Sequence, residues 1–429
     1  MLRALAHRNF RLFFFGQGVS LIGTWMQQVA TTWLVYELEH STFLLGLVGF
    51  ASQIPTFLVT PLAGVFTDRW NRHRALMVTQ SLALLQAATL TLLTLFERIN
   101  VSNLLALSFS LGLVNAFDIP LRQAFLTEMV GKPEDRANAI ALNSSLFNGA
   151  RLVGPALAGL LIAATGEWFC FLLNAISYLA VLIALSLIRV APREQRSEHP
   201  SVLAGLKEGL GYAFRFPPIR AILSLVALVG FSVIPVSVLL PIFATQSFGG
   251  GANTLGLLTA AQGVGSLVGA LYLASRRTVL GLGKRIAAAA VIVGIGILGF
   301  SWACDFWTGA AMLLLTGFGI MVQMAACNTI LQTIVDEDKR GRVMSLHAMA
   351  FMGTAPLGSL AAGALADRIG SPATVRIGGA ACVLGGLLFL RQLTQLREHI
   401  RPIYVRAGIL PEIADGMETA NELASPRRG

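Results

Sequence analysis

Three charged residues, Asp118, Arg122 and Arg151, lie inside long apolar stretches of this 429-residue sequence. Charge inside a bilayer is costly, so such side chains pair with one another or face an aqueous path. Asp118 and Arg122 are four residues apart and share one helix face. Arg151 belongs to the next apolar stretch, which an antiparallel arrangement could bring beside Asp118. Two interpretations stay open: structural pairing, or handling of a substrate or proton with Asp118 as the titrating acid.

Polar amides and one imidazole interrupt the same stretches. Such groups either hydrogen-bond neighbouring helices or line an aqueous path. Histidine has an ordinary pKa of about 6.5, so His347 is a second candidate proton carrier, or a neutral side chain bonded to a neighbouring helix. The amides that we expect to line a substrate cavity are Gln27, Gln28, Asn115, Asn143, Gln323 and Asn328.

The composition is that of a membrane protein. The chain is 55% apolar and 13% charged, with a mean hydropathy of +0.69, which leaves too little charge to cover a soluble surface. A bilayer-spanning helix needs about 20 predominantly apolar residues. Twelve such runs lie near residues 12–36, 43–66, 75–97, 102–127, 137–163, 167–188, 218–245, 252–275, 284–304, 307–334, 343–365 and 372–390.

The basic residues indicate an orientation. Most of the 32 Lys and Arg residues fall on one side if the N-terminus is cytoplasmic, and only Arg98, Arg368 and Arg376 fall on the other. Positive loops are retained in the cytoplasm, so both termini are predicted there. Attraction of these loops to an anionic leaflet accounts for the net charge of +10, and no nucleic-acid partner is expected.

The one long internal break predicts a cytoplasmic linker over residues 191–217. Within it Leu206, Leu210 and Phe214 are spaced for one face of a helix lying on the membrane surface. The charged segment 393–429 is predicted to be a disordered cytoplasmic tail.

Catalytic and metal-binding patterns are missing from the sequence. It contains no H-x-x-x-x-D, G-x-S-x-G, H-E-x-x-H or Walker G-x-x-x-x-G-K-[ST] pattern, and its four cysteines lack metal-ligand spacing. We therefore expect no catalytic residue, no metal and no cofactor. A polytopic membrane enzyme is the alternative class, without a motif to support it.

A unit of about 200 residues runs twice through the chain. Residues 134–166 align with residues 338–370 without gaps, which pairs Gly154 with Gly358 and Gly159 with Gly363. Asn143 pairs with His347, as expected for opposing walls of a central cavity. Glycines that recur in register indicate recurring close helix contacts. Two homologous apolar halves are the usual construction of a secondary transporter, with its site between them.

Residues 64–74, GVFTDRWNRHR, separate the second and third runs. They resemble the G-x-x-x-D-R-x-G-R-R loop of the major facilitator superfamily, with Asn71 at the usual Gly position, where Asn tolerates a left-handed turn. The matching residues are Gly64, Asp68, Arg69, Arg72 and, displaced by one position, Arg74. The resemblance implies a gating loop in which Asp68 and Arg72 latch the two halves together on the inner side.

Residues 150–159, ARLVGPALAG, resemble the fifth-helix antiporter motif of the superfamily, which ends G-P-x-x-G-G. Here alanine replaces two of the glycines. Gly154, Pro155 and Gly159 are therefore predicted to pack closely against a neighbouring helix. Longer segments, such as RNFRLFFFGQ and DIPLRQAFLTEMVG, resemble the exporter branch that contains the enterobactin exporter and macrolide-efflux proteins, over roughly residues 8–390.

The resemblance implies an all-α membrane protein of twelve transmembrane helices, arranged as two pseudo-symmetric six-helix bundles. The bundles are expected over residues 1–190 and 218–392. The expected function is proton-driven efflux of a small amphipathic molecule by alternating access, from a monomer in a bacterial inner membrane. An importer or a lipid transporter of the same fold is the alternative.

Overall fold

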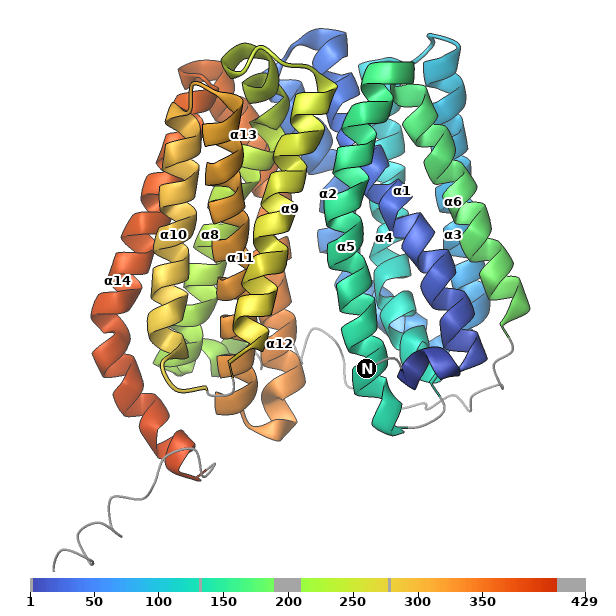
Figure 1. Ribbon diagram of the computed structural model, residues 1–429. Coiled ribbons are helices and arrows are strands. Elements are labelled where there is room, and N and C mark those ends of the chain that lie inside the picture. Colours follow the sequence, from blue (N-terminus) through green and yellow to red (C-terminus); the bar gives the residue numbers. More distant parts are fainter. Residues whose placement is uncertain (1–2, 131–132, 189–209, 277–278, 407–429) are drawn as a thin grey trace, which may run out of the picture.

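The computed structural model describes residues 3–130, 133–188, 210–276 and 279–406, and the regular structure of these residues is entirely helical (Figure 1). After a short 3₁₀ turn, the first half of the chain forms α1 (Arg8–Glu39), α2 (Thr42–Arg69), α3 (Arg72–Leu95), α4 (Val101–Glu128), α5 (Pro133–Thr165) and α6 (Glu167–Leu187). The second half forms α8 (Pro217–Ile242), which a π-helical turn extends to Ser247, then α9 (Ala252–Ala274), α10 (Leu282–Trp302), α11 (Phe306–Ile334), α12 (Glu337–Met352), α13 (Thr354–Ile369) and α14 (Ser371–Arg406).

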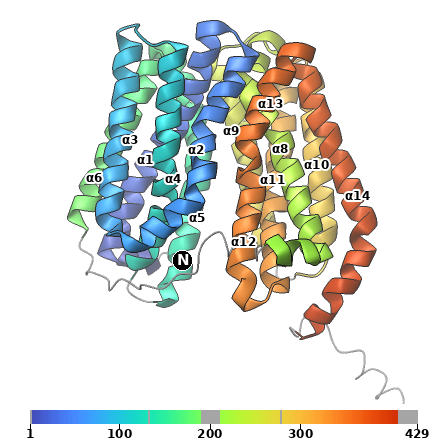
Figure 2. The same ribbon diagram turned by 180° about the vertical axis from the view of Figure 1, so that it is seen from behind.

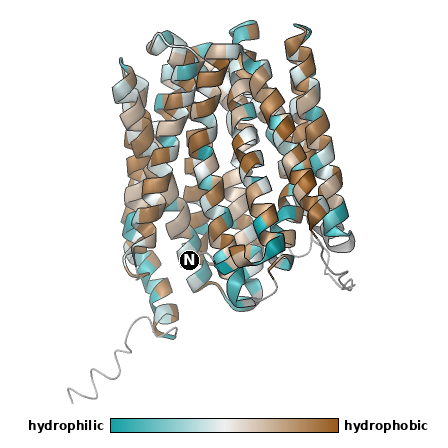
Figure 3. Ribbon diagram, turned by 45° about the vertical axis from the view of Figure 1, so that its right-hand side comes forward, coloured by the Kyte–Doolittle hydropathy of each residue, from teal (hydrophilic) through white to brown (hydrophobic). Residues whose placement is uncertain are grey.

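Within the described residues, eleven helical segments are long and apolar enough to cross a membrane. The apolar colouring in Figure 3 runs along the helix shafts, and polar residues gather toward the helix ends. The pair α12 and α13 counts as one of these segments, and α1 is not among them. The 32 residues of α1 include Gln17, Gln27 and Gln28, which lower its hydropathy although its length suffices.

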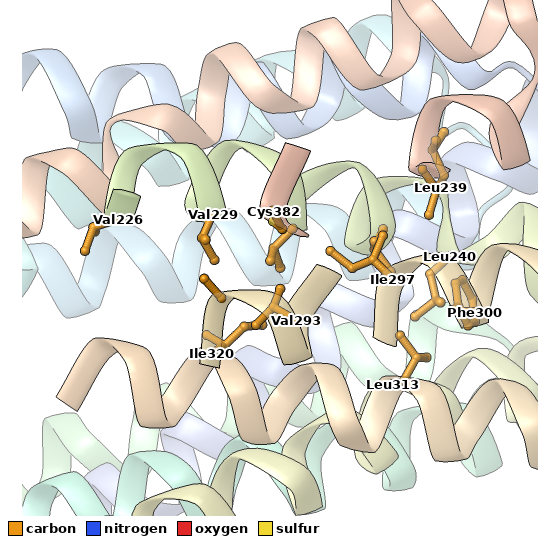
Figure 4. Packing of buried hydrophobic residues seen from close by; sticks show 14 of the residues in the cluster. Val226, Val229, Leu239, Leu240, Val293, Ile297, Phe300, Leu313, Ile320 and Cys382 are labelled. Carbon is orange, nitrogen blue, oxygen red and sulfur yellow. The ribbon is translucent and has the colours of Figure 1, made fainter. Parts of the chain in front are cut away.

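The helices form two groups that follow the order of the chain (Figure 1). In the first group, α1 packs against α5 and α6, α2 against α4, and α3 against α4 and α6. In the second, α10 packs against α11 and α14, α11 against α9, and α8 against α13 and α14. Figure 4 shows part of the core of the second group, where Val293 and Ile297 of α10 pack near Ile320 of α11 and Cys382 of α14.

Two helix pairs, α5 with α9 and α2 with α13, join the groups. A methyl group added at Gly46 of α2 would lie 2.8 Å from the Cα of Gly363 in α13, and one added at Gly159 of α5 would lie 3.0 Å from the Cα of Gly256 in α9. Gly46 and Gly256 are each the fifth residue of their helices, and Gly159 and Gly363 are equivalent in the sequence repeat. The two contacts are therefore one glycine-to-glycine crossing that the repeat makes twice.

Both crossings lie toward the end of the molecule where α1 finishes, which we call the Glu37 end. Two further hydrogen bonds join the groups there, between Tyr36 Oη and Thr245 Oγ1 at 2.8 Å and from Thr42 Oγ1 to Asp367 Oδ1 at 3.4 Å. In Figures 1 and 2 the groups meet at this end and diverge toward the opposite end, where α3 begins. We call the opposite end the Arg72 end.

The predicted run 343–365 is divided at Gly353 into α12 and α13. Pro356 lies in the first turn of α13 and has no N–H to donate to the carbonyl of Met352. The hydroxyl of Thr354 donates back to the carbonyl of Phe351 at 2.8 Å. The equivalent helix in the first half, α5, passes Gly149 without a break.

The start of the predicted tail is helical, which corrects the expectation of disorder from residue 393. Helix α14 continues to Arg406 because Leu393 and Leu396 are buried in the core of the second group, and Ile400 and Ile403 pack against that core at helical spacing. Residues 407–429 lie outside the described part of the chain.

Most of the predicted linker helix, with Leu206, also lies outside the described residues. The described part, Leu210–Arg215, is helical, and Leu210 and Phe214 are both exposed.

Candidate functional site

Asp118 is buried in the first group and takes part in three polar contacts. Its Oδ1 accepts hydrogen bonds from Thr79 Oγ1 at 2.8 Å and from Gln80 Nε2 at 2.7 Å, both on α3, and its Oδ2 forms an ion pair with Arg122. The charge is thus compensated within α3 and α4. The suggested pairing of Asp118 with Arg151 is wrong, because Arg122, one helical turn along α4, occupies the carboxylate.

Arg151 has an aromatic neighbour instead. Its guanidinium carbon lies 5.7 Å from the centre of the Trp25 ring, and Trp25 in turn makes an edge-to-face contact with Phe147 at 5.8 Å between ring centres. In the described parts of the chain, Arg151 forms no ion pair. A guanidinium over an indole face gains a cation–π attraction but keeps its charge.

The predicted cavity amides do not form one cluster. Gln27 is buried inside the first group, where its amide donates to Gln86 Oε1 at 3.0 Å and its carbonyl accepts from Asn174 at 2.7 Å. It therefore connects α1 with α3 and α6, and the prediction that it lines a cavity is wrong. Gln28, the next residue, is exposed.

Of the remaining amides, Asn115 and Asn143 are half-buried, and Asn328 accepts a hydrogen bond from Gln332 at 2.6 Å. Gln323 is almost completely buried in α11, and neither of its side-chain polar atoms has a hydrogen-bond partner in the described structure. His347 in α12 is 4% exposed, and its Nε2 is likewise without a partner there. Buried polar atoms without a hydrogen-bond partner are uncommon in folded proteins, and a functional role is one of the explanations for them.

The loop at the Arg72 end is partly described. Gly64, Asp68 and Arg69 lie in the last turns of α2, and the side chains of Asp68 and Arg69 are outside the described structure. Arg72 forms an ion pair with Glu128 of α4 at 2.6 Å.

Asn71 caps the N-terminus of α3, and its Oδ1 accepts the backbone N–H of Arg74 at 3.0 Å. Its φ of −68° is not left-handed, so Asn at this place serves as a helix cap and not as a substitute for a left-handed glycine.

The fifth-helix residues pack against two different helices. A methyl group at Gly154 would lie 2.6 Å from Trp25 Cβ of α1, whereas Gly159 faces α9. Pro155 is inside α5, and its carbonyl oxygen would contact a side chain added at Gly256. Helix α5 is thus held between α1 of its own group and α9 of the other.

Two acids that the sequence analysis passed over meet at the Glu37 end. The side chains of Glu37 and Glu167 are in hydrogen-bonding contact, and Trp33 Nε1 donates to Glu37 at 2.8 Å. They line a cavity of about 380 Å³ between the groups, which Gly251 and Ala252 close from the side of α9. Both acids lie at the ends of apolar runs, where charged residues are common in membrane proteins. The sequence therefore carries no signal that they are functional candidates, which only their contact between two helices indicates.

The chain has two groups of membrane-spanning helices, joined by a glycine crossing that the repeat makes twice. This architecture is that of a transporter of the major facilitator type. The family model for transmembrane secretion effectors matches residues 1–402, and the chain belongs to that family. The resemblance seen in the sequence is thus confirmed, and the chain is a multi-span membrane transporter and not an enzyme.

Several bacterial transporters are similar over nearly their whole length. The staphyloferrin A transporter of Staphylococcus aureus is 28% identical over 88% of this chain and 95% of its own. The multidrug efflux pump Tap of Mycolicibacterium fortuitum is 28% identical over 87% and 93%. Macrolide efflux protein A of Streptococcus pyogenes is 23% identical over 85% and 92%.

Solved structures share the fold at low identity. A bacterial homologue of the iron transporter ferroportin in its inward-facing state has a TM-score of 0.69 at 18% identity, covering 90% of this chain and 98% of its own. A bacterial homologue of the lysosomal transporter Spinster, inward-facing and occupied, has a TM-score of 0.68 at 14% identity, covering 91% and 96%.

Proposed function

We propose that this protein exports a small amphipathic molecule by proton-driven alternating access. Its relatives are named for a siderophore, for several drugs and for macrolides, and each is a transporter. We count α1 as a twelfth span because it packs along α5 and α6 of the first group, so that residues 1–190 and 218–392 form two six-helix bundles.

The basic loops support an orientation. At the Arg72 end, the first turns of α1, α3, α8 and α10 carry Arg8, Arg72, Arg220 and Lys284, and Arg406 ends α14 there. By the positive-inside rule this end faces the cytoplasm, together with both termini, and the Glu37 end faces outward. The bacterial relatives favour the inner membrane, where we propose that the protein works as a monomer.

The observation that carries alternating access is the pair of glycine crossings at the Glu37 end. The groups touch there through Gly46 with Gly363 and Gly159 with Gly256, and they diverge toward the Arg72 end (Figure 2). This is the arrangement of an inward-open state, in which the outer gate is closed. Rocking about the middle of the bundles would open the outer gate and close the inner one.

The loop at the inner side belongs to the opposite state in this scheme. We propose that Asp68, with Arg72, latches the two bundles when the inner gate closes, since a helix N-terminus attracts an acid. Arg72 pairs with Glu128 inside its own bundle. Gly64, Arg69 and Arg74 complete this loop.

For proton coupling, the contacts favour His347 over Asp118. Asp118 is held by two hydrogen bonds and an ion pair, so loss of its charge would leave Arg122 unpaired. Histidine has an ordinary pKa near neutral pH, and the Nε2 of His347 has no hydrogen-bond partner among the described residues, so it is available to exchange a proton with water that reaches it. The contacting carboxyl groups of Glu37 and Glu167 offer a second place where a proton can be held between two oxygens.

Flux in proteoliposomes with an imposed pH gradient tests the function. Siderophores, macrolides, dyes and lysolipids should be offered from each side in turn, with empty liposomes as the control. Proton-linked transport of a siderophore, macrolide or dye from the Arg72 side of the membrane to the Glu37 side supports efflux. Movement only in the other direction identifies an importer, and movement of lysolipids alone identifies a lipid transporter. Flux that does not depend on the pH gradient would rule out proton coupling.

A further inference from the structure

Arg151 extends across the inner face of the first bundle. On one side of α5, a methyl group added at Gly263 of α9 would lie 3.3 Å from the Arg151 carbonyl oxygen. On the other side the Arg151 guanidinium lies over Trp25 of α1. The Arg151 side chain therefore reaches from α5, which contacts α9 of the second bundle, toward α1 of its own bundle.

The aromatic neighbours of this guanidinium are partly exposed. Phe147 lies one helical turn from Arg151 on α5, and its side chain is 45% exposed. Trp25 is half-buried, and Gln28, which is exposed, lies one turn further along the same face of α1. The cluster of Arg151, Trp25 and Phe147 thus offers a cation beside two aromatic surfaces.

Among the deep charges of the described residues, that of Arg151 has no ion-pair partner. Asp118 pairs with Arg122, and Glu128 pairs with Arg72. Glu37 and Glu167 contact each other at the outer end. None of these acids forms an ion pair with Arg151 in the described structure. An arginine deep in a membrane protein requires either a partner or an aqueous surface that an anion can reach.

We propose that Arg151, Trp25 and Phe147 form a subsite that binds a carboxylate joined to an apolar or aromatic body. The guanidinium holds the carboxylate in a bidentate contact, and the rings receive the apolar part. This inference deepens the proposed efflux function and rests on it for the identity of the ligand as substrate.

Binding by the purified full-length protein in detergent tests the subsite, with 2-naphthoate as the probe and neutral 2-naphthamide as its isosteric partner. Loss of a hydrogen-bonded charge pair typically weakens binding by about tenfold to a hundredfold. Arg151→Gln should therefore weaken 2-naphthoate binding by that factor and leave 2-naphthamide binding unchanged. Arg151→Lys keeps the charge without the planar fork and should give an intermediate loss.

Arg376→Gln is the matched control. The Arg376 guanidinium also lies over an indole ring, that of Trp302, with 6.0 Å to its centre, but on α14 and away from the face between the bundles. This variant removes the same charge and the same kind of ring contact, so it should bind both probes as the wild type does. Thermal unfolding of each variant checks that it is folded. If Arg151→Gln does not fold, the loss of 2-naphthoate binding by Arg151→Lys is the test of the subsite.

Three outcomes overturn the subsite: no binding of 2-naphthoate to the wild type, equal affinity of the wild type for both probes, or equal 2-naphthoate binding by wild type and the Arg151 variants. If dyes are transported while one of these outcomes is seen, the efflux proposal stands and the subsite fails. If 2-naphthoate binds through Arg151 while no compound is transported, the subsite stands and the efflux proposal fails.

Discussion

Gly256→Ala should weaken the outer gate without damaging either bundle. The added methyl group would lie 2.8 Å from the Cα and 2.9 Å from the N of Gly159, and closer still to the Pro155 carbonyl oxygen. Ordinary carbon contacts are about 3.5–4.0 Å, so α5 and α9 must separate by roughly 1 Å. Overpacking of this kind costs about 1–3 kcal/mol.

That cost falls on the closed state alone, because the bundles part when the outer gate opens. At about 1.4 kcal/mol for each factor of ten, the ratio of closed to open molecules should fall by roughly five- to 150-fold. Alanine also favours a helix over glycine by up to about 1 kcal/mol, but it does so in both states. The gain therefore does not offset the clash.

Spin labels across the outer end can measure this shift. Cys304, at the Glu37 end of the second bundle, is exposed, whereas Cys170, Cys327 and Cys382 are buried. Glu97→Cys adds a label to the exposed loop between α3 and α4 at the same end of the first bundle. The distance distribution between the labels should widen in Gly256→Ala.

Gly149→Ala is the matched control on α5, because a methyl group there meets no atom within 4 Å. It should leave the distribution as it is in the wild type. An unchanged distribution in Gly256→Ala, or the same widening in Gly149→Ala, would refute the idea that the glycine crossing closes the gate.

Four further substitutions test other parts of the structure. Asp118→Asn should lower the free energy of unfolding by about 3–5 kcal/mol, because it leaves a partly buried arginine without its charge partner; wild-type thermal stability in detergent would contradict this. His347→Gln should abolish gradient-driven transport and keep downhill exchange, and retained uphill flux would exclude it as the carrier. Asp68→Asn should reduce flux with normal membrane insertion, and undiminished flux would argue against the latch. Asp305 lies between α10 and α11, where hydrogen bonds from Thr308 hold its carboxyl pKa below the ordinary value. The charged cap is therefore intact above the ordinary pKa and is lost as the pH falls through the lowered one. Asp305→Ala should speed hydrogen exchange at the Thr308 amide at neutral pH, and this difference from the wild type should shrink as the pH falls through the lowered pKa. Equal exchange rates in the variant and the wild type at neutral pH would refute the cap.

The spans were predictable because apolar runs and the polar breaks between them are properties of the local sequence. The run 102–127 became α4, Val101–Glu128, and the run 252–275 became α9, Ala252–Ala274. The exception at α14 has a local cause as well. Its apolar residues beyond Gln392 recur at helical spacing, but the charged residues between them lower the mean hydropathy of the segment, so that the mean does not reveal the pattern.

The contacts of the candidate site were not predictable in the same way. A helix that is apolar all round gives little sign of which face meets another helix and which meets lipid. The sequence could place Asp118 and Arg151 at similar depths, but not show that Thr79 and Gln80 turn toward the acid or that Trp25 lies beneath the guanidinium. Glycine was the informative exception, since its recurrence in the repeat indicated the crossings.

The break at Gly353 makes the two halves mechanically unequal. Helix α5 is continuous past Gly149, so it can act as a lever: a displacement near Gly159, at the Glu37 end, is carried to the Arg72 end of the helix with opposite sign. Its counterpart in the second half is divided into α12 and α13, so α12 can change its direction while α13 remains packed against α2. Helix α5 would then transmit a movement from one end of the molecule to the other, whereas the break between α12 and α13 would take up the corresponding movement in the second half.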